Sequence, residues 1–508
     1  MALFWRGLLI LPLLFVYASS HFIYTKRHFD KPEVVGFKDL DYLHGDGGGF
    51  LSSPIEDDDS VKASKTLKLP GPPCRHVEGT NEEDCFAHSI LLDVETAHIR
   101  PLRLNYDTWC SSGALDINGR LVSTGGYNNG SDTVRIFDLC DTCEWQEFPG
   151  ALGNGRWYAT QVTLADGKFM VFGGRDFPTY EFVPPEGQKN TINEVINFPF
   201  LKETHDPVEN NLYPFVFLST DGNLFVFSNN RSVLLNTQTH TIIHEYPVLP
   251  GGAHNYPSSG CASLLPIMLK PNEDRKSIPV EVLVCRLLGD MVVLPTGDVL
   301  LVNGAKTGLA GWDDARDPNL HPVLYKFQTD GTGSKFTVLN PSNIPRMYHS
   351  SFAVFPDAKI LIAGSNTNLG YLDDALFPTE VRVEKFSPHY LDPNLGMFQQ
   401  EIIVEKSNNQ VKYGQKFTTQ IRGNVEIDQQ KLQVTIYSPP FVTHGVAMNQ
   451  RLIQLGIVEF NKYAALNTNN IVLQAPINSN IAPPGYYMLF VNYNGVPCCR
   501  SMWVRILP

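Results

Sequence analysis

Positive charge is scarce in this sequence. The 508 residues include 40 Lys and Arg against 52 Asp and Glu, and the formal net charge is −12. Proteins that bind nucleic acid contact its phosphates through clustered Lys and Arg, and no basic stripe of this kind is present. We therefore expect no nucleic-acid partner.

Long apolar runs are absent except at the N-terminus. There an apolar run over positions 8–16 follows Arg6 and precedes Ala18, Ser19 and Ser20, which is the pattern of a secretory signal peptide over residues 1–20. The alternative is a membrane anchor, but the run is shorter than the ~20 apolar residues that span a bilayer. We expect a secreted, extracellular protein with no membrane association once the signal is removed.

Cysteines are few and odd in number. Nine are present, so at least one lacks a disulfide partner in the oxidising compartment that export implies. The short loops between them predict pairs Cys74–Cys85 and Cys140–Cys143. The second pair could instead be half of a zinc site, but no second pair with ligand spacing follows. Two acceptor sequons, at Asn129 and at position 230, are consistent with a glycoprotein.

Turn-forming and aromatic residues are abundant, which favours short strands over helices. The sequence holds 40 Gly, 36 Pro, 30 Phe and 20 Tyr. A strand–turn–strand unit recurs over residues 114–126, 163–174, 219–229, 294–304 and 355–365, with turn positions Gly119, Gly167, Gly222, Gly297 and Ala358. These turns are 48, 55, 75 and 61 residues apart. A turn-rich β repeat with a period near 50 predicts a kelch-type, seven-bladed-like β-propeller.

The length indicates more than one domain. Charge runs with Gly and Pro clusters predict a flexible lead-in over residues 21–80, followed by the propeller over 81–394. Segments 86–102 and 380–391 resemble outer strands without inner ones, and could share one blade. The repeat then stops, and alternating strands over 395–508 predict an immunoglobulin-like β-sandwich.

One blade is shorter than the others. Segments 261–269 and 280–285 look like its two inner strands, with the turn near Asp274. Only 23 residues separate Asp274 from Gly297, against 48 to 61 elsewhere, so roughly 25 to 38 residues, about two outer strands, are missing relative to the kelch period. The sequence therefore predicts one truncated, two-stranded blade inside an otherwise four-stranded ring, with Val282 and Val284 less covered than their counterparts.

Four residues share one phase of the repeat. Cys110, Tyr158, Tyr213 and His349 each lie nine residues before their turn, and Tyr348 lies one residue before His349. Equal phase places these side chains near the axis on one face of the ring. They could simply pack the mouth of the channel. Alternatively they form a metal site, and phenol and imidazole ligands suit Cu(II).

The sequence around these residues resembles a known family. The strings DTWCSSGALD, NGRWYATQVTLADGKFMVFGG, NNLYPFVFLSTDGNLFVF, IPRMYHSS and VTHGVAMNQRLIQL are similar to plant-type glyoxal oxidases and, more distantly, to galactose oxidase. The resemblance runs from about Cys74 to the C-terminus. It implies a copper-radical oxidase that converts aldehydes such as glyoxal or methylglyoxal to carboxylic acids and reduces O2 to hydrogen peroxide in the cell wall or extracellular matrix. The alternatives are an alcohol or sugar oxidase and an impaired, non-catalytic kelch binding protein.

The resemblance also assigns roles. It implies a thioether bond between Cys110 and Tyr158, which makes Tyr158 the radical-bearing ligand, and an axial Tyr348 that accepts the substrate proton. It implies that His349 and His444 complete the copper ligands. The repeat phase supports Cys110, Tyr158 and His349 independently, whereas His444 depends on the resemblance alone.

Three further features of the sequence concern the proposed site or the fold that holds it. Trp109 or Trp157 could stack over the thioether, or both could be ordinary core residues. Arg156 and Arg346 could bind a substrate group or form salt bridges. Relatives carry additional residues between positions 285 and 290, where this chain joins its strands almost directly.

Overall fold

The computed structural model describes residues 8–15, 19–25, 75–76, 83–84, 89–93 and 99–508, apart from 139, 141, 185–193, 259, 272–281, 286–288, 312–313, 328–333, 369–371, 373, 424 and 464–467. This part of the chain is nearly all-β, as the sequence predicts, and α1 (Pro199–Glu203) is its one α-helix. No helix in it is long and apolar enough to cross a membrane.

Seven small sheets follow one another through the described residues up to position 386. The first contains β1 (Leu8–Phe15), β2 (Ser19–Thr25), β5 (Ser89–Asp93) and β6 (Ile99–Leu102). The second contains β7 (Ser112–Leu115), β8 (Leu121–Thr124), β9 (Val134–Phe137) and β10 (Trp145–Phe148). The third contains β11 (Thr160–Thr163), β12 (Phe169–Phe172), β13 (Thr179–Phe182) and β14 (Ile196–Asn197). The fourth contains β15 (Phe215–Leu218), β16 (Leu224–Ser228), β17 (Arg231–Asn236) and β18 (Thr241–Glu245).

The next three sheets differ in size. The fifth pairs only β19 (Cys261–Leu264) with β21 (Val282–Cys285). The sixth contains β22 (Asp290–Val293), β23 (Val299–Val302), β26 (Val323–Tyr325) and β27 (Phe336–Val338). The seventh contains β28 (Ser351–Val354), β29 (Ile360–Ala363) and β30 (Val383–Phe386). Two short hairpins lie outside these sheets: β3 (Arg75–His76) with β4 (Glu83–Asp84), and β24 (Ala305–Thr307) with β25 (Arg316–Pro318).

All five predicted repeat units are antiparallel hairpins. They are β7–β8, β11–β12, β15–β16, β22–β23 and β28–β29, and their turn positions all have positive φ, from 63° at Ala358 to 99° at Gly297. Every residue of β8, β12, β23 and β29 is buried, because neighbouring sheets cover both faces of these strands. The repeat seen in the sequence is therefore a true structural repeat.

The predicted two-stranded unit is present in the described residues. Cys261 pairs with Cys285 and Leu264 with Val282, and Val282 is only half-buried, as expected; the side chain of Val284 lies outside the described residues. Two details of the prediction were wrong. The segment 261–269 is not one strand, because β20 (Ile267–Met268) leaves to pair in parallel with a C-terminal strand. The remaining sheets are not all four-stranded, since the seventh has three strands.

The N-terminal strands also correct two expectations. Segments 86–102 and 380–391 do not share a sheet: β5 and β6 join β2 and β1, whereas β30 uses the free edge of β29. Residues 21–25 belong to β2 rather than to a flexible lead-in, and most of 26–80 lies outside the described residues. Strand β1 falls within the predicted signal peptide.

Two further sheets lie C-terminal to the repeats. One contains β20, β37 (Arg451–Gln454), β34 (Leu432–Ser438), β40 (Gly485–Tyr493), β42 (Met502–Ile506), β32 (Gln410–Val411) and β41 (Val496–Pro497). The other contains β31 (Glu401–Ile402), β33 (Lys416–Arg422), β39 (Thr468–Gln474) and β38 (Ile457–Tyr463). Strand β33 alternates between buried Phe417, Thr419 and Ile421 and more exposed neighbours, which is the pattern of a sheet with one face in a core.

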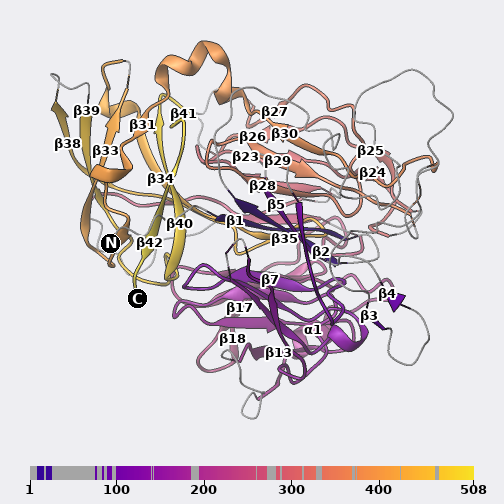
Figure 1. Cartoon of the computed structure of the whole chain (residues 1–508). Coiled ribbons are helices and arrows are strands. Elements are labelled where there is room, and N and C mark those ends of the chain that lie inside the picture. The colour runs from indigo at the N-terminus through magenta and orange to yellow at the C-terminus, as the bar shows by residue number, and fades with distance from the viewer. Residues whose placement is uncertain are drawn as a thin grey trace.

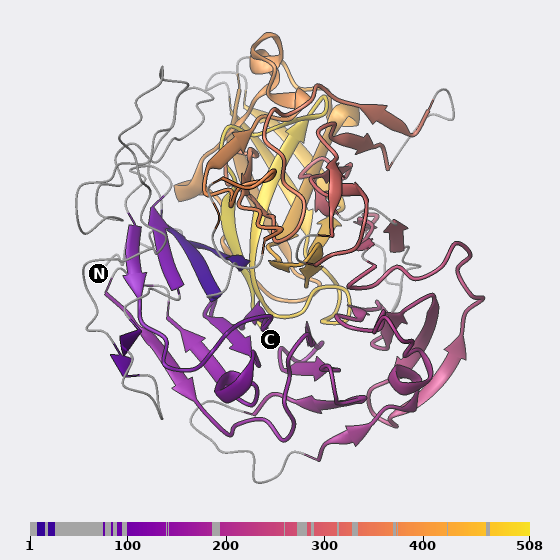
Figure 2. The same cartoon turned by 90° about the vertical axis from the view of Figure 1, so that its right-hand side faces the viewer.

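A hairpin from this C-terminal region enters the centre of the repeats. We call it the central hairpin; it pairs β35 (Phe441–Thr443) with β36 (Val446–Met448). It contacts the first strand of all seven sheets, and those strands contact one another in the orders β7–β11–β15 and β19–β22–β28–β1. Figure 1 shows β35 between the purple and the orange sheets, and in Figure 2 the purple to pink sheets follow one another along an arc. The hairpin thus occupies the axis on which the phase-equivalent residues were expected to converge.

One of the two predicted disulfides is confirmed, and the other lies outside the described residues. Cys140 and Cys143 form a disulfide, which excludes the zinc alternative for this pair. Cys74 and Cys85 lie outside the described residues. Cys261 is also disulfide-bonded, which the sequence did not predict, while Cys110, Cys498 and Cys499 are free thiols.

Candidate active site

The phase-equivalent residues share an unusual backbone conformation. Cys110, Tyr158, Tyr213 and His349 each lie two residues before the first strand of a sheet, with φ values of 57°, 65°, 47° and 62°. Left-handed backbone is strained for residues other than glycine, by roughly 1–2 kcal/mol each. Such strain is retained where surrounding structure fixes it, commonly at functional sites. Here the left-handed backbone conformation turns the four phase-equivalent side chains towards the axis.

Backbone hydrogen bonds link three of these positions. The Tyr158 N–H donates to the Cys110 carbonyl at 3.1 Å, and the Tyr213 N–H donates to the Tyr158 carbonyl at 2.9 Å. The side-chain amide of Asn255 donates to the Tyr213 carbonyl at 3.1 Å. The strained residues of neighbouring sheets therefore hold one another in place.

His444 reaches the same point from the tip of the central hairpin. His444 and Gly445 form its two-residue turn with φ values of 52° and 76°, as a type I′ turn requires. The His444 Nε2 lies 3.1 Å from the His349 Nε2 and 3.5 Å from the Cys110 Sγ. Its Nδ1 is 2.6 Å from the Thr443 hydroxyl, which fixes the orientation of the ring.

The phenols complete the cluster. The Tyr348 ring stacks on the His349 ring with centroids 3.7 Å apart, and both residues lie in a turn just before β28. The Tyr348 hydroxyl is 2.8 Å from that of Tyr256, which in turn donates to the Tyr158 hydroxyl at 3.4 Å. The structure thus brings together all five residues that the sequence singled out.

Burial keeps this group of side chains uncharged. It raises the pKa values of Cys110, Tyr158 and Tyr348, whose charged forms would be anions. It lowers the pKa of His349 to about 3 and that of His444 well below its usual value. Neutral imidazoles have the free lone pair that a metal needs, and a bound cation withdraws protons from phenols and thiols.

The donor set fits a metal that accepts nitrogen and phenolate oxygen. Two imidazole Nε2 atoms only 3.1 Å apart are close enough to bind one ion, and the nearby phenols supply oxygen. Within the described ranges, no group of three or more His, Cys, Asp and Glu has metal-binding geometry. This composition suits Cu(II) better than zinc.

Sequence reasoning left two tyrosines of the site unassigned. Tyr213 shares the phase of the repeat, and its ring lies 4.9 Å from that of His444. Tyr256 precedes the shortened sheet and no repeat signal marks it, yet it stacks on Tyr158 at 4.9 Å and 22°. Of the two tryptophans, Trp157 is the one that contacts Tyr158, with ring centroids 4.6 Å apart. Trp109 packs against Trp157, with ring centroids 5.4 Å apart.

The two arginines near the site are structural. Arg156 pairs with the buried Glu181 at 2.6 Å and donates to the Gly173 carbonyl. Arg346 pairs with Glu384 at 2.9 Å and donates to backbone carbonyls. Both guanidinium groups are buried, so the suggestion that they bind substrate was wrong and the salt-bridge alternative is confirmed.

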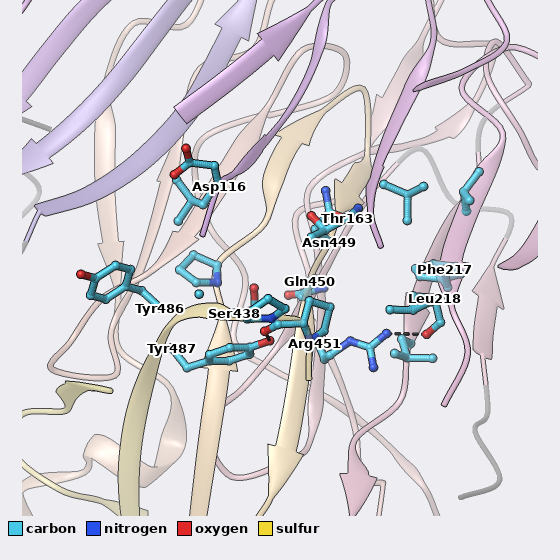
Figure 3. A pocket seen from close by; sticks show the side chains of 18 residues that line it. Asp116, Thr163, Phe217, Leu218, Ser438, Asn449, Gln450, Arg451, Tyr486 and Tyr487 are labelled. Carbon is cyan, nitrogen blue, oxygen red and sulfur yellow. Dashed lines mark hydrogen bonds between the residues drawn. The ribbon is translucent and has the colours of Figure 1, made fainter. Parts of the chain in front are cut away.

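Two cavities lie near the axis. A small one beside the cluster is lined by Asp290, Tyr348, His349 and His444, among others. A larger one, shown in Figure 3, lies between the repeats and the C-terminal sheets and contains none of the five site residues. In it, the Arg451 guanidinium donates to the carbonyl of Leu218 (Figure 3). The same guanidinium also donates to the carbonyl of Ile481, outside the cavity lining. The contact with Leu218 fixes the C-terminal region, and with it the central hairpin, against the fourth sheet.

Comparison with known families identifies the relationship. The family description "Glyoxal oxidase N-terminus" matches residues 55–285 and 286–390, and "Galactose oxidase-like, Early set domain" matches residues 401–506. The chain belongs to the glyoxal oxidase family. As a member it is an oxidoreductase. The first match divides between residues 285 and 286, at the point where the repeat spacing predicts missing residues.

Named relatives of this glyoxal oxidase family member support the same conclusion. It is 44% identical over 488 residues to aldehyde oxidase GLOX1 of Arabidopsis thaliana, covering 87% of this chain and 78% of the relative. It is 35% identical to aldehyde oxidase GLOX of Vitis pseudoreticulata, covering 87% and 90%. A fungal alcohol oxidase of the AA5 family, solved in complex with copper, has the same fold, with a TM-score of 0.62, 18% identity and coverage of 82% and 89%.

Proposed function

We propose that this protein is an extracellular copper-radical oxidase that converts small aldehydes to carboxylic acids and reduces O2 to hydrogen peroxide. One observation carries the proposal. Cys110, Tyr158, Tyr348 and His349, which lie before three different sheets, meet His444 at the tip of the central hairpin. The aldehyde oxidase names of relatives support the substrate class, and the copper complex of the fungal alcohol oxidase supports the metal.

The same proposal covers the finer architecture. Residues 1–20 are a signal peptide, 81–394 form a kelch-type β-propeller with one truncated blade, and 395–508 form a β-sandwich that contributes one ligand. The six sheets between residues 112 and 386 and the axial position of the central hairpin support the boundary between propeller and sandwich. The signal peptide is supported by its sequence pattern alone, because β1 and β2 join β5 in the first sheet. Export would place the enzyme in the cell wall or extracellular matrix, where O2 is available.

Four residues would hold the metal, and one pair would form the organic cofactor. Tyr158, Tyr348, His349 and His444 are the copper ligands. A bond between the Cys110 sulfur and the Tyr158 ring forms with loss of two hydrogen atoms to O2. When bound, copper together with this thioether would accept the two electrons removed from the substrate and pass them to O2.

The surrounding residues would make this chemistry possible. The substrate is the hydrated aldehyde, RCH(OH)2, and its reaction with O2 gives RCOOH and H2O2 without a further reactant. The Tyr348 oxygen would take the proton from the substrate hydroxyl, and burial keeps His349 neutral for ligation. Trp157 lies against Tyr158, and the buried setting keeps water away from the oxidised ring.

Peroxide release tests the proposal directly. The full-length chain, expressed for secretion and loaded with copper, is offered a panel of small aldehydes and primary alcohols under air. We expect peroxide with aldehydes, and a mass two hydrogens below that of the uncross-linked chain. Faster turnover of alcohols would assign a galactose oxidase-like substrate class. Neither peroxide nor mass loss would identify a kelch binding protein and reject the proposal.

A further inference from the structure

Tyr256 lies outside the repeat phase and is not one of the five predicted site residues, yet its ring contacts three of them. Its ring lies 4.9 Å from Tyr158, 6.2 Å from Tyr348 and, edge-on, 5.1 Å from His444. The rings of Tyr158 and Tyr348 are within 22° and 20° of parallel to it. It is 8% exposed, so it forms part of the wall that separates these rings from solvent.

The hydroxyl of Tyr256 has two other phenol hydroxyls as its hydrogen-bond partners. Other buried tyrosines pair their hydroxyls with a backbone carbonyl, as Tyr390 and Tyr487 do at 2.7 Å, or with one side chain, as Tyr437 does with Gln450 at 3.1 Å. The Tyr256 hydroxyl instead lies 2.8 Å from the Tyr348 hydroxyl and donates to the Tyr158 hydroxyl at 3.4 Å. Packing in the core does not by itself require a hydroxyl that bridges the phenols of Tyr158 and Tyr348.

The backbone that carries Tyr256 is fixed from both sides. Tyr256 forms a β-bridge with Leu212, directly before Tyr213. Ser258 N–H donates to the Asn210 side chain at 3.0 Å, and the Ala310 N–H donates to the Pro257 carbonyl at 2.7 Å. Because its neighbours are held in this way, the ring can impose a position on the phenols that it contacts.

We propose that Tyr256 is a positioning residue of this site, whose hydroxyl orients the Tyr348 and Tyr158 hydroxyls and whose ring covers Tyr158. The inference rests on the proposed function, since it concerns the same site. A hydrogen bond that holds Tyr348 towards the substrate affects the rate of the reaction more than the binding of the substrate. A ring packed on Tyr158 protects its oxidised form from solvent.

The test compares Tyr256→Phe with Tyr390→Phe in the copper-loaded, full-length protein. Each variant loses one buried hydroxyl, but Tyr390 bonds only to a backbone carbonyl. For Tyr256→Phe we expect wild-type copper content and mass, a kcat about tenfold lower, KM within about twofold, and faster decay of the tyrosyl-radical absorbance and EPR signal. Tyr390→Phe should match wild type in all four. Wild-type kcat and radical lifetime in Tyr256→Phe would overturn the inference.

A second variant separates this inference from the proposed function. In chain produced without copper, Cys110 is a free and fully buried thiol, and its alkylation can be followed by peptide mass mapping. Tyr256→Met removes the covering ring, and we expect Cys110 to be alkylated severalfold faster than in wild type or Tyr390→Phe. An unchanged rate would show that Tyr256 does not cover the site, whatever the copper experiments give. Absence of copper and cross-link from the wild type would reject the proposed function alone.

Discussion

At the scale of single residues, the proposed thioether cofactor depends on Cys110. Its thiol is buried beside His444, Tyr158 and Tyr213. We expect Cys110→Ser to retain near wild-type copper, because the four proposed ligands remain, but to lack the two-hydrogen mass loss and to lose turnover by at least about a hundredfold. Cys499→Ser, which changes an exposed free thiol, is the control. Full turnover in Cys110→Ser would exclude the thioether mechanism.

A second residue-scale prediction concerns Asp290. Its carboxyl accepts hydrogen bonds from Asn303 and Ser350 at 2.8 and 3.1 Å, and burial raises its pKa from 3.8 to about 7. An acid whose pKa is raised by folding holds its proton more tightly in the folded state. Stability is therefore lost as pH rises between about 4 and about 7, by up to about 1.4 kcal/mol per pH unit.

Replacement of this carboxyl should make the effect visible. Asp290→Asn keeps an acceptor but cannot ionise, so its denaturation midpoint, relative to wild type, should be higher at pH 8 than at pH 5 in the metal-free protein. The exposed Asp166→Asn should show no such change. An equal difference at both pH values would mean that Asp290 is not the group responsible.

At the scale of elements, the central hairpin determines where His444 lies. A Cβ at Gly445, where φ is 76°, would meet the Gly289 carbonyl oxygen at 2.8 Å; Gly495 has the same φ and nothing within 4 Å. Both Gly→Ala variants should lose about 1–2 kcal/mol from left-handed strain. Only Gly445→Ala should also lose activity and copper affinity, because the contact displaces the turn. Equal losses of activity in both would remove the hairpin turn from the mechanism.

At the scale of the whole molecule, the shortened fifth sheet lies in the chain between two sheets with apolar, exposed outer strands. The sheets before and after it in the chain end in exposed strands: Ile242 and Ile243 on β18 are 44% and 50% exposed, and Phe336 and Val338 on β27 are 53% and 67% exposed. A two-stranded sheet has marginal stability by itself. Insertion of the corresponding segment from a full-length relative between residues 285 and 286 should raise secreted yield and Tm together. If the restored chain melts no higher, the missing strands are not a source of instability.

The sequence predicted the repeat, the short fifth sheet and the convergence of Cys110, Tyr158 and His349, because these features depend on local periodicity. It could not place Tyr256, which lies in an irregular segment outside the repeat. Nor could it show that β20 leaves its sheet, since parallel pairing with β37 depends on tertiary packing. Arg156 was ambiguous for a similar reason: its partner Glu181 is set by sheet register, not by a motif.

The position of His444 also sets the order of events during biosynthesis. Cys110 and His444 are 334 positions apart in the chain, and the hairpin that carries His444 contacts the first strand of each of the seven repeat sheets. Most of the polypeptide must therefore be synthesised before the proposed ligand set can assemble. The proposed cofactor would mature only after the C-terminal region has docked. On the proposed assignment, a chain that stops before residue 440 would lack His444 and could not complete the copper site that joins Cys110 to Tyr158.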